Sequence, residues 1–183
     1  AGMDEAGLIS ARNVFANYNA TNPLNLLALM AVLARIEGSA LSRRAQPPAL
    51  PLRTASPVGP LPPLLDPATL APATRRAAMQ LNDIGLPPGK RALVAGVPRH
   101  LAHWPEFLAL CVDSLEPVAD ELGRSIEFVH ADAWTRARGF AADLPPLHDF
   151  GHRDAVALAL RRFTSVELIA NYIPKVSALM AAL

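Results

Sequence analysis

Cysteine, an excess of charge of one sign and long apolar runs are missing or nearly missing from this sequence, and each lack excludes a class of protein. A single cysteine, Cys111, cannot form an internal disulfide, and its apolar neighbours favour a buried, inert thiol. The 17 basic and 16 acidic residues almost balance, and no basic stripe is present, so the sequence does not indicate a nucleic-acid partner. A lone thiol fits a reducing, cytoplasmic compartment.

No apolar run reaches the ~18 residues that a membrane span needs, so we expect no membrane partner. No charged segment followed by an apolar one opens the chain, which argues against a signal peptide. The opening Ala1-Gly2-Met3 is not a native initiator and is consistent with a tag scar or a cut end. Sustained period-two alternation is also missing, and strands are therefore not expected.

Proline, by contrast, is abundant. The chain has 18 prolines, and nine of them lie between Pro47 and Pro72. A regular helix cannot hold so many, because each interior proline removes a hydrogen-bond donor and clashes with the preceding turn. We therefore expect residues 39–71 to form an extended connector within one compact domain, since 183 residues with 51% hydrophobic content suffice for one core.

Helical periodicity on both sides of the connector predicts an all-α protein. Before it, we expect a helix from Asp4 to Asn17, a break at 18–21, and a second helix capped by Asn22 with Pro23 at its first position. After it, Thr164 to Glu167 has the pattern of a capping box for the last helix. The further helices are expected near 73–84, 90–103, 105–121, 124–142, 152–162 and 165–182, with Pro98 and Pro117 kinking or splitting theirs.

Short sequence matches indicate an internal repeat, although a chain rich in alanine and leucine produces such matches by chance as well. Residues 28–33 and 178–183 are identical at five of six positions, and the Ala-Asn-Tyr of 16–18 recurs at 170–172. If the repeat is real, residues 1–38 are the last two helices of a truncated first repeat, and 72–183 are a complete second repeat.

An ordered set of segments resembles the group I 2-haloacid dehalogenases, which process both D and L substrates. The segment 18–27, with Asn22-Pro23 at its centre, resembles the end of the first repeat of that family, and 61–66 resembles the opening of the second. The block from His100 to Leu108 and the segments 115–118 and 168–173 then follow in the family's order.

The resemblance implies a helical pseudo-dimer of two repeats, with an active site between them and no cofactor or metal. It implies hydrolysis of small 2-haloalkanoic acids, in which an aspartate activates a water that attacks the halogen-bearing carbon directly. An asparagine holds that water. The chemistry is general-base catalysis with a positioned nucleophile.

Carried over by residue, the resemblance gives a mixed site. Asn22 matches the asparagine that holds water, but Val97 occupies the position of the aspartate, with Gly96 before it. A pocket tyrosine of the family falls near Ser165, and Ile169 follows on the same helix. The substrate-binding positions are therefore Gly96, Val97, Ser165 and Ile169.

His100 is the candidate replacement for the missing base, because it lies one helical turn after Val97 and a histidine can activate water near neutral pH. The plainer interpretation is that His100 packs or caps beside Trp104. A metal site built from His100, His103, His148, Asp149 and His152 is a weaker alternative.

Two functions therefore remain open: a hydrolytic dehalogenase, or a non-catalytic helical homologue that binds a small acid or a protein. The highly apolar 24–36 segment predicts either self-association or a missing N-terminal segment that covers it.

Overall fold

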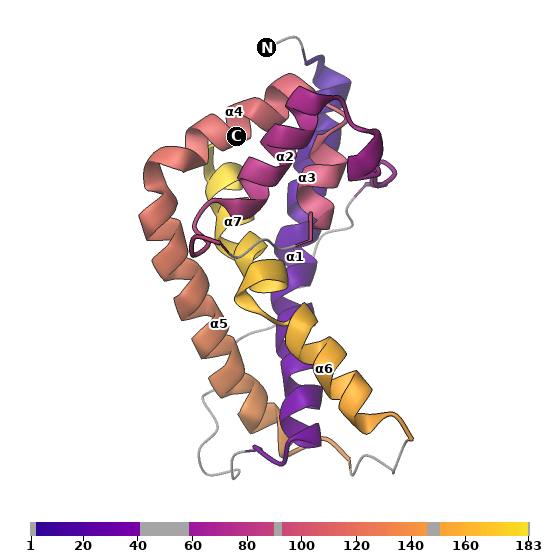
Figure 1. Cartoon of the computed structure of the whole chain (residues 1–183), viewed down its shortest axis with the longest axis vertical. Coiled ribbons are helices and arrows are strands. Elements are labelled where there is room, and N and C mark those ends of the chain that lie inside the picture. The colour runs from indigo at the N-terminus through magenta and orange to yellow at the C-terminus, as the bar shows by residue number, and fades with distance from the viewer. Residues whose placement is uncertain (1–2, 41–58, 90–92, 146–150, 183) are drawn as a thin grey trace.

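The computed structural model describes residues 3–40, 59–89, 93–145 and 151–182. Every regular element in these ranges is helical, which confirms the predicted all-α class (Figure 1). The α-helices are α1 (Glu5–Ile36), α2 (Pro72–Asp83), α3 (Gly96–Leu101), α4 (Pro105–Leu115), α5 (Ala119–Ala141), α6 (Arg153–Phe163) and α7 (Asn171–Ala182). Three short turns, η2 (Pro67–Thr69), η3 (Glu116–Val118) and η4 (Val166–Ala170), connect some of them.

Helix α1 is continuous over 32 residues, so the predicted break at 18–21 is wrong. Its start is capped by Asp4, whose carboxylate accepts a hydrogen bond from Gly7 N at 2.8 Å. Pro23 lies inside the helix and removes one backbone donor, and Asn22 is therefore an interior residue rather than a cap. Packing against α5, α6 and α7 along the length of α1 offsets that single lost bond.

Beyond the connector, the helices agree with the prediction in number and order, but their ends differ. Pro98 lies in the first turn of α3, where backbone N–H groups have no partner within the helix, so it causes no break. Pro117 does separate two helices, as expected, and α5 begins directly after η3. The connector residues 41–58 and the segment 90–92 lie outside the described residues.

The capping box predicted at the last helix is wrong. The Thr164 hydroxyl donates back to the carbonyl of Leu160 at 2.8 Å, and Ser165, the residue before η4, makes no side-chain cap. η4 is a π-helical turn that leads into α7, which contains Pro174. A wide turn and an interior proline both interrupt the regular hydrogen-bond ladder, so the start of α7 is its weakest part.

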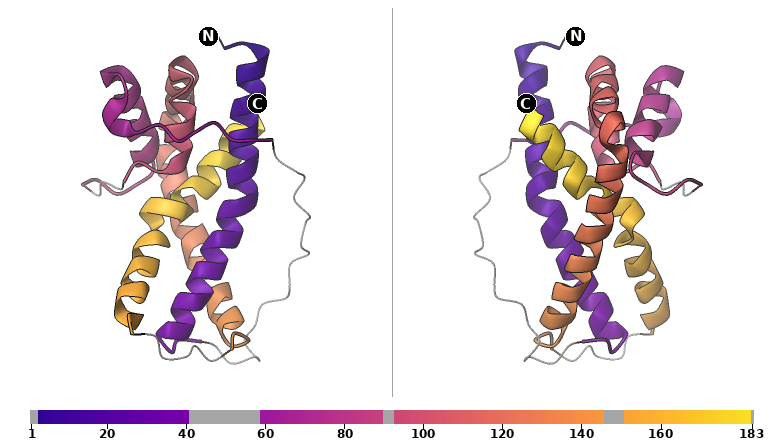
Figure 2. Two further views of the ribbon diagram at one scale, coloured as in Figure 1. Left: turned by 90° about the vertical axis from the view of Figure 1, so that its right-hand side faces the viewer. Right: turned by 90° about the vertical axis from the view of Figure 1, so that its left-hand side faces the viewer.

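The long helices α1 and α5 run along the molecule, with α7 between them (Figures 1 and 2). Helices α2, α3 and α4 gather at the N-terminal end of α1, and α6 packs on its C-terminal part. The largest apolar cluster accordingly joins α1 to α2, α3, α4 and α7, with Phe15, Leu81 and Leu108 fully buried. A second cluster joins α1 to α5 and the η4–α7 segment around Leu26 and Ile126.

Arginines from two other helices hold the C-terminal end of α1. Arg138 of α5 donates to the carbonyl of Ser39 at 2.7 Å, and Arg153 of α6 donates to that of Ile36. Arg161 of α6 pairs with Glu37 at 2.6 Å. Cations at this end also complement the negative pole of the helix dipole.

No described helix combines the length and apolarity that a membrane crossing requires. The two-repeat organisation and the division at 38 and 72 remain predictions.

Candidate functional site

The first candidate site lies where α3 meets α1, at His100, Gly96 and Tyr18. The rings of Tyr18 and His100 are 5.8 Å apart between centroids, with an interplanar angle of 57°. Tyr18 also explains the glycine, because a Cβ at Gly96 would collide with the Tyr18 hydroxyl. Gly96 was predicted to be a substrate-binding position. The space that a side chain at Gly96 would need is already filled by Tyr18.

His100 is buried, with 5% of its surface exposed, and its Nδ1 has no hydrogen-bond partner. Burial lowers the pKa of His100 from its usual value, although a hydrogen bond with the Pro62 carbonyl partly opposes this. Because a carbonyl only accepts hydrogen bonds, the other ring nitrogen must carry the proton. In the neutral form of the ring, Nδ1 is then a buried lone pair without a partner.

A positive charge lies near both rings. Arg99 donates from Nε to the Leu65 carbonyl at 2.8 Å, and its charge acts on both Tyr18 and His100. Burial is the main effect on Tyr18 and raises the pKa of its hydroxyl, so Tyr18 stays protonated. An imidazole, a phenol and a nearby guanidinium therefore lie together where α3 meets α1.

The other predicted residues lie at different places along the fold. Asn22 is buried, with 8% exposure, and lies one turn after Tyr18 on the same face of α1. Val97 is 1% exposed and packs in the first cluster. Ile169 belongs instead to the second cluster, and half-buried Ser165 precedes it at the start of η4. The structure thus brings Gly96, Val97 and His100 to the N-terminal half of α1, whereas Ile169 packs against its C-terminal half, in the cluster around Leu26.

The plainer interpretation, that His100 packs or caps beside Trp104, stays a prediction, and the burial of His100 is in line with a packing role. The His100 ring is tilted against that of Tyr18, and the ring of His103 lies 5.8 Å from that of Trp104. His103 also bonds to the Pro63 carbonyl through Nε2 at 2.9 Å.

A buried polar cluster that sequence analysis missed joins α7 to the end of α2. Lys175 is fully buried and donates from Nζ to the carbonyls of Leu81 and Asn82, at 2.7 and 3.0 Å. Tyr172 donates to Asn82 Oδ1 at 3.0 Å, and Asn171 donates to the Asn82 carbonyl at 2.8 Å. These bonds satisfy carbonyls that the last turn of α2 leaves without helical partners.

This cluster, like His100, holds strongly perturbed groups. Burial lowers the pKa of Lys175 to about 7, and the negative charge of Asp83 opposes part of that fall. Burial likewise raises the pKa of Tyr172 well above its usual value. The one sequence signal was a lysine in an otherwise apolar final helix, but its acceptors are backbone carbonyls about 90 residues away, which no side-chain pattern reveals.

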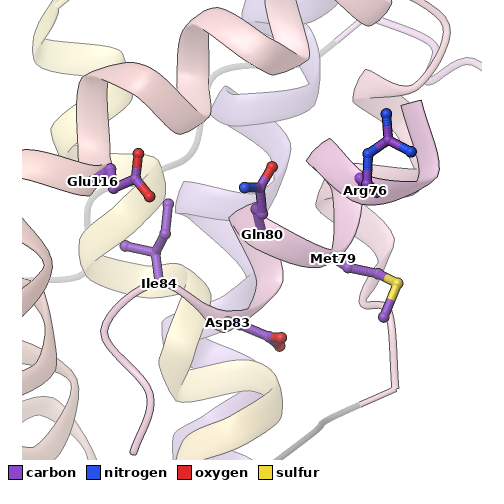
Figure 3. Close-up of a pocket in the computed structure, with 6 residues that line it drawn as sticks. All are labelled: Arg76, Met79, Gln80, Asp83, Ile84 and Glu116. Atoms are coloured by element: carbon purple, nitrogen blue, oxygen red, sulfur yellow. The ribbon is translucent and has the colours of Figure 1, made fainter. Parts of the chain in front are cut away.

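The described surface is hollowed beside α2, as an open depression of about 390 Å³ (Figure 3). The side chains that line it come from the exposed face of α2 and from the start of η3: Arg76, Met79, Gln80, Asp83, Ile84 and Glu116. None of the predicted site residues is among them. Both signs of charge are represented, so the depression has no evident preference for an acid.

Within the described ranges, no three His, Cys, Asp or Glu residues gather as metal ligands. Two of the residues considered as metal ligands, His148 and Asp149, lie outside those ranges.

Comparison of the chain with protein-family models, with curated proteins and with solved structures found no match.

Proposed function

We propose that this chain is a hydrolytic protein of the 2-haloacid dehalogenase type, in which His100 replaces the missing aspartate as the base. The observation that carries the proposal is the buried, unpartnered Nδ1 of His100, directly against α1. Buried polar atoms without partners are rare in folded proteins and are often found where a water or ligand belongs.

In the proposed reaction, His100 Nδ1 takes a proton from a water held between α3 and α1. The water oxygen attacks C2 of a small 2-haloalkanoic acid, and the carbon–halogen bond breaks as the halide leaves with its electron pair. The product is a 2-hydroxy acid of inverted configuration. Asn22 supports the water, and no cofactor is needed.

The remaining residues of the site take simpler roles in this proposal. Arg99 supplies the positive charge that attracts the substrate carboxylate, since its charge already acts on both rings. Val97 gives an apolar wall beside the alkyl group, and Gly96 allows Tyr18 to approach α3. Ser165 and Ile169 belong to a more remote wall on the η4 side. The compartment that suits a buried thiol and this chemistry is the cytoplasm.

The test is halide release from racemic 2-bromopropionate and 2-chloropropionate. Release should be lost in His100→Ala and reduced in Asn22→Ala. His103→Ala is the matched control, because it removes the same side chain one turn away and should keep the activity. Reaction in ¹⁸O-water should place one labelled oxygen at C2. Activity that persists in folded His100→Ala would refute the role of the histidine.

A second candidate is a non-catalytic helical homologue that binds a small acid or a protein, including a second copy of this chain. The complete burial of Val97 at the aspartate position favours it, because an apolar side chain there cannot take a proton. Several large apolar side chains are also exposed, Phe128 at 72% and Leu24 at 56% among them. No halide release from a folded protein, together with saturable propionate binding or a dimer in light scattering, would favour this candidate.

A further inference from the structure

We infer that Lys175 forms a proton-controlled latch, which holds α7 against the end of α2 when its amine is neutral and releases it when the amine is protonated. The inference concerns a part of the molecule that the proposed reaction does not use, and it stands whether or not that reaction occurs.

The complete burial of Lys175 disfavours a charged amine, and it opposes the attraction that the carbonyls at the negative end of α2 have for a cation. A neutral amine has two N–H donors, and Lys175 Nζ has two acceptors within bonding distance, the carbonyls of Leu81 and Asn82. An ammonium has a third donor and a full charge. The side chain has no exposed surface, so water does not reach that charge.

Few charged groups near Lys175 offset the cost of burying a charged ammonium. From α2, Asp83 is the carboxylate that acts on Lys175, but it bonds to Asn82 Nδ2 at 3.3 Å rather than to Nζ. On α7 itself, the Tyr172 ring lies with its centroid 5.2 Å from Nζ, which gives a weak attraction for a cation. From α1, Tyr18 acts on Tyr172, and from α4, the thiol of Cys111 packs in the same apolar cluster.

The rest of the junction depends on the same backbone. Asn82 receives bonds from Asn171 and Tyr172 as well as from Lys175, and its own Oδ1 accepts from the backbone N–H of Ala95 just before α3. Withdrawal of the lysine would remove its hydrogen bond to the Leu81 carbonyl and leave the Asn82 carbonyl with Asn171 as its donor, which weakens the junction.

The chain also provides a place for the movement. α7 follows the π-helical turn η4 and contains Pro174 next to Lys175, so its first turns lack a regular hydrogen-bond ladder. Figure 1 shows α7 passing close to the end of α2 before it reaches the C-terminus. This weak start can open locally at the junction with α2, while Val176 and Leu179 keep the rest of α7 in the core. The burial that lowers the pKa of Lys175 to about 7 places this transition near neutral pH.

The experiment begins with the lysine itself. Lys90 and Lys175 are the two lysines of the chain, so ¹³C-lysine labelling gives two side-chain NMR signals that variants assign at once. The signal of Lys175 should titrate near neutral pH. A titration midpoint above pH ~9.5, close to the value of a free lysine, would overturn the inference.

Release of α7 is then measured by hydrogen exchange, with rates corrected for the intrinsic effect of pH. Protection of α7 and of the end of α2 should rise about thirtyfold between pH ~6 and pH ~8.5, because opening takes up one proton. Lys175→Met should remove this dependence. Equal protection at both pH values in the unmodified protein would overturn the latch, and that outcome does not require any variant to fold.

A second variant tests the direction of the effect. Asp83→Asn removes the negative charge that favours the ammonium, so the Lys175 midpoint and the exchange transition should both move to lower pH. Asp113→Asn, on the exposed face of α4, is the matched control and should leave both unchanged. A shift to higher pH in Asp83→Asn would contradict the proposed electrostatics.

Discussion

A methyl group added at Gly96 should destabilise the protein through its collision with Tyr18, and the size of the effect follows from that contact. The Cβ of Gly96→Ala would overlap the Tyr18 hydroxyl and lie 3.0 Å from Cζ. Overpacking of this kind costs about 1–3 kcal/mol. Gly96 has an ordinary φ and is the first residue of α3, so alanine gives back about 0.5–1 kcal/mol of chain entropy. The net loss should be about 1–2 kcal/mol.

Urea unfolding followed by circular dichroism measures that loss, and Tyr18→Phe identifies its cause. Removal of the hydroxyl leaves the Cζ contact, so the double variant should recover part of the stability, with a coupling energy of about 0.5–1.5 kcal/mol. Gly151→Ala is the control, because nothing lies within 4 Å of its Cβ position. Additive effects of Gly96→Ala and Tyr18→Phe would refute the packing of Tyr18 on α3, and with it the geometry of the candidate site.

Three further predictions concern the core and its buried titratable groups. The free energy of unfolding should rise by about 2 kcal/mol from pH ~7 to ~9, because Lys175, with a pKa of about 7, releases a proton in the fold that the unfolded chain still holds. Above pH ~9 this gain in stability should end. Burial raises the pKa of Cys111 to about 12 and also raises that of Tyr172, so both groups keep their protons in the fold while the unfolded chain loses them. The same urea titration measures this. Phe15→Ala should cost about 3–5 kcal/mol in urea unfolding, because the ring is fully buried and lies 6.1 Å from that of Phe107. Cys111 should react with a thiol reagent only after urea unfolds the protein, and rapid labelling of the native state would contradict its burial.

The helical class and most helix positions were predictable because periodicity and capping signals are local. The continuity of α1 was not, since Asn22-Pro23 is a normal helix start in sequence terms. What overrides it is the packing of distant helices along both halves of α1, and local propensity carries no information about that. The same limit applies to the capping box at Thr164, whose hydroxyl found an acceptor in the preceding turn instead.

The candidate site was predictable only in part, and for a related reason. His100 was recognised as a titratable residue near Val97, but its contact with Tyr18 joins segments about 80 residues apart. The lysine cluster was missed entirely, because its acceptors are main-chain carbonyls that every residue possesses. Sequence therefore indicates side chains that can carry chemistry, whereas burial and backbone geometry decide which of them are perturbed.

The long first helix also has a consequence for biosynthesis. α1 contributes to each apolar cluster of the described core, yet its main partner, α5, begins 83 residues after α1 ends at Ile36. At a translation rate of about 5–20 residues per second, α1 would wait roughly 4–17 s before the first residue of that partner is made. During this interval Leu26, Met30 and Leu33 would be open to solvent on a nascent chain. Such a segment is a natural target for a ribosome-associated chaperone.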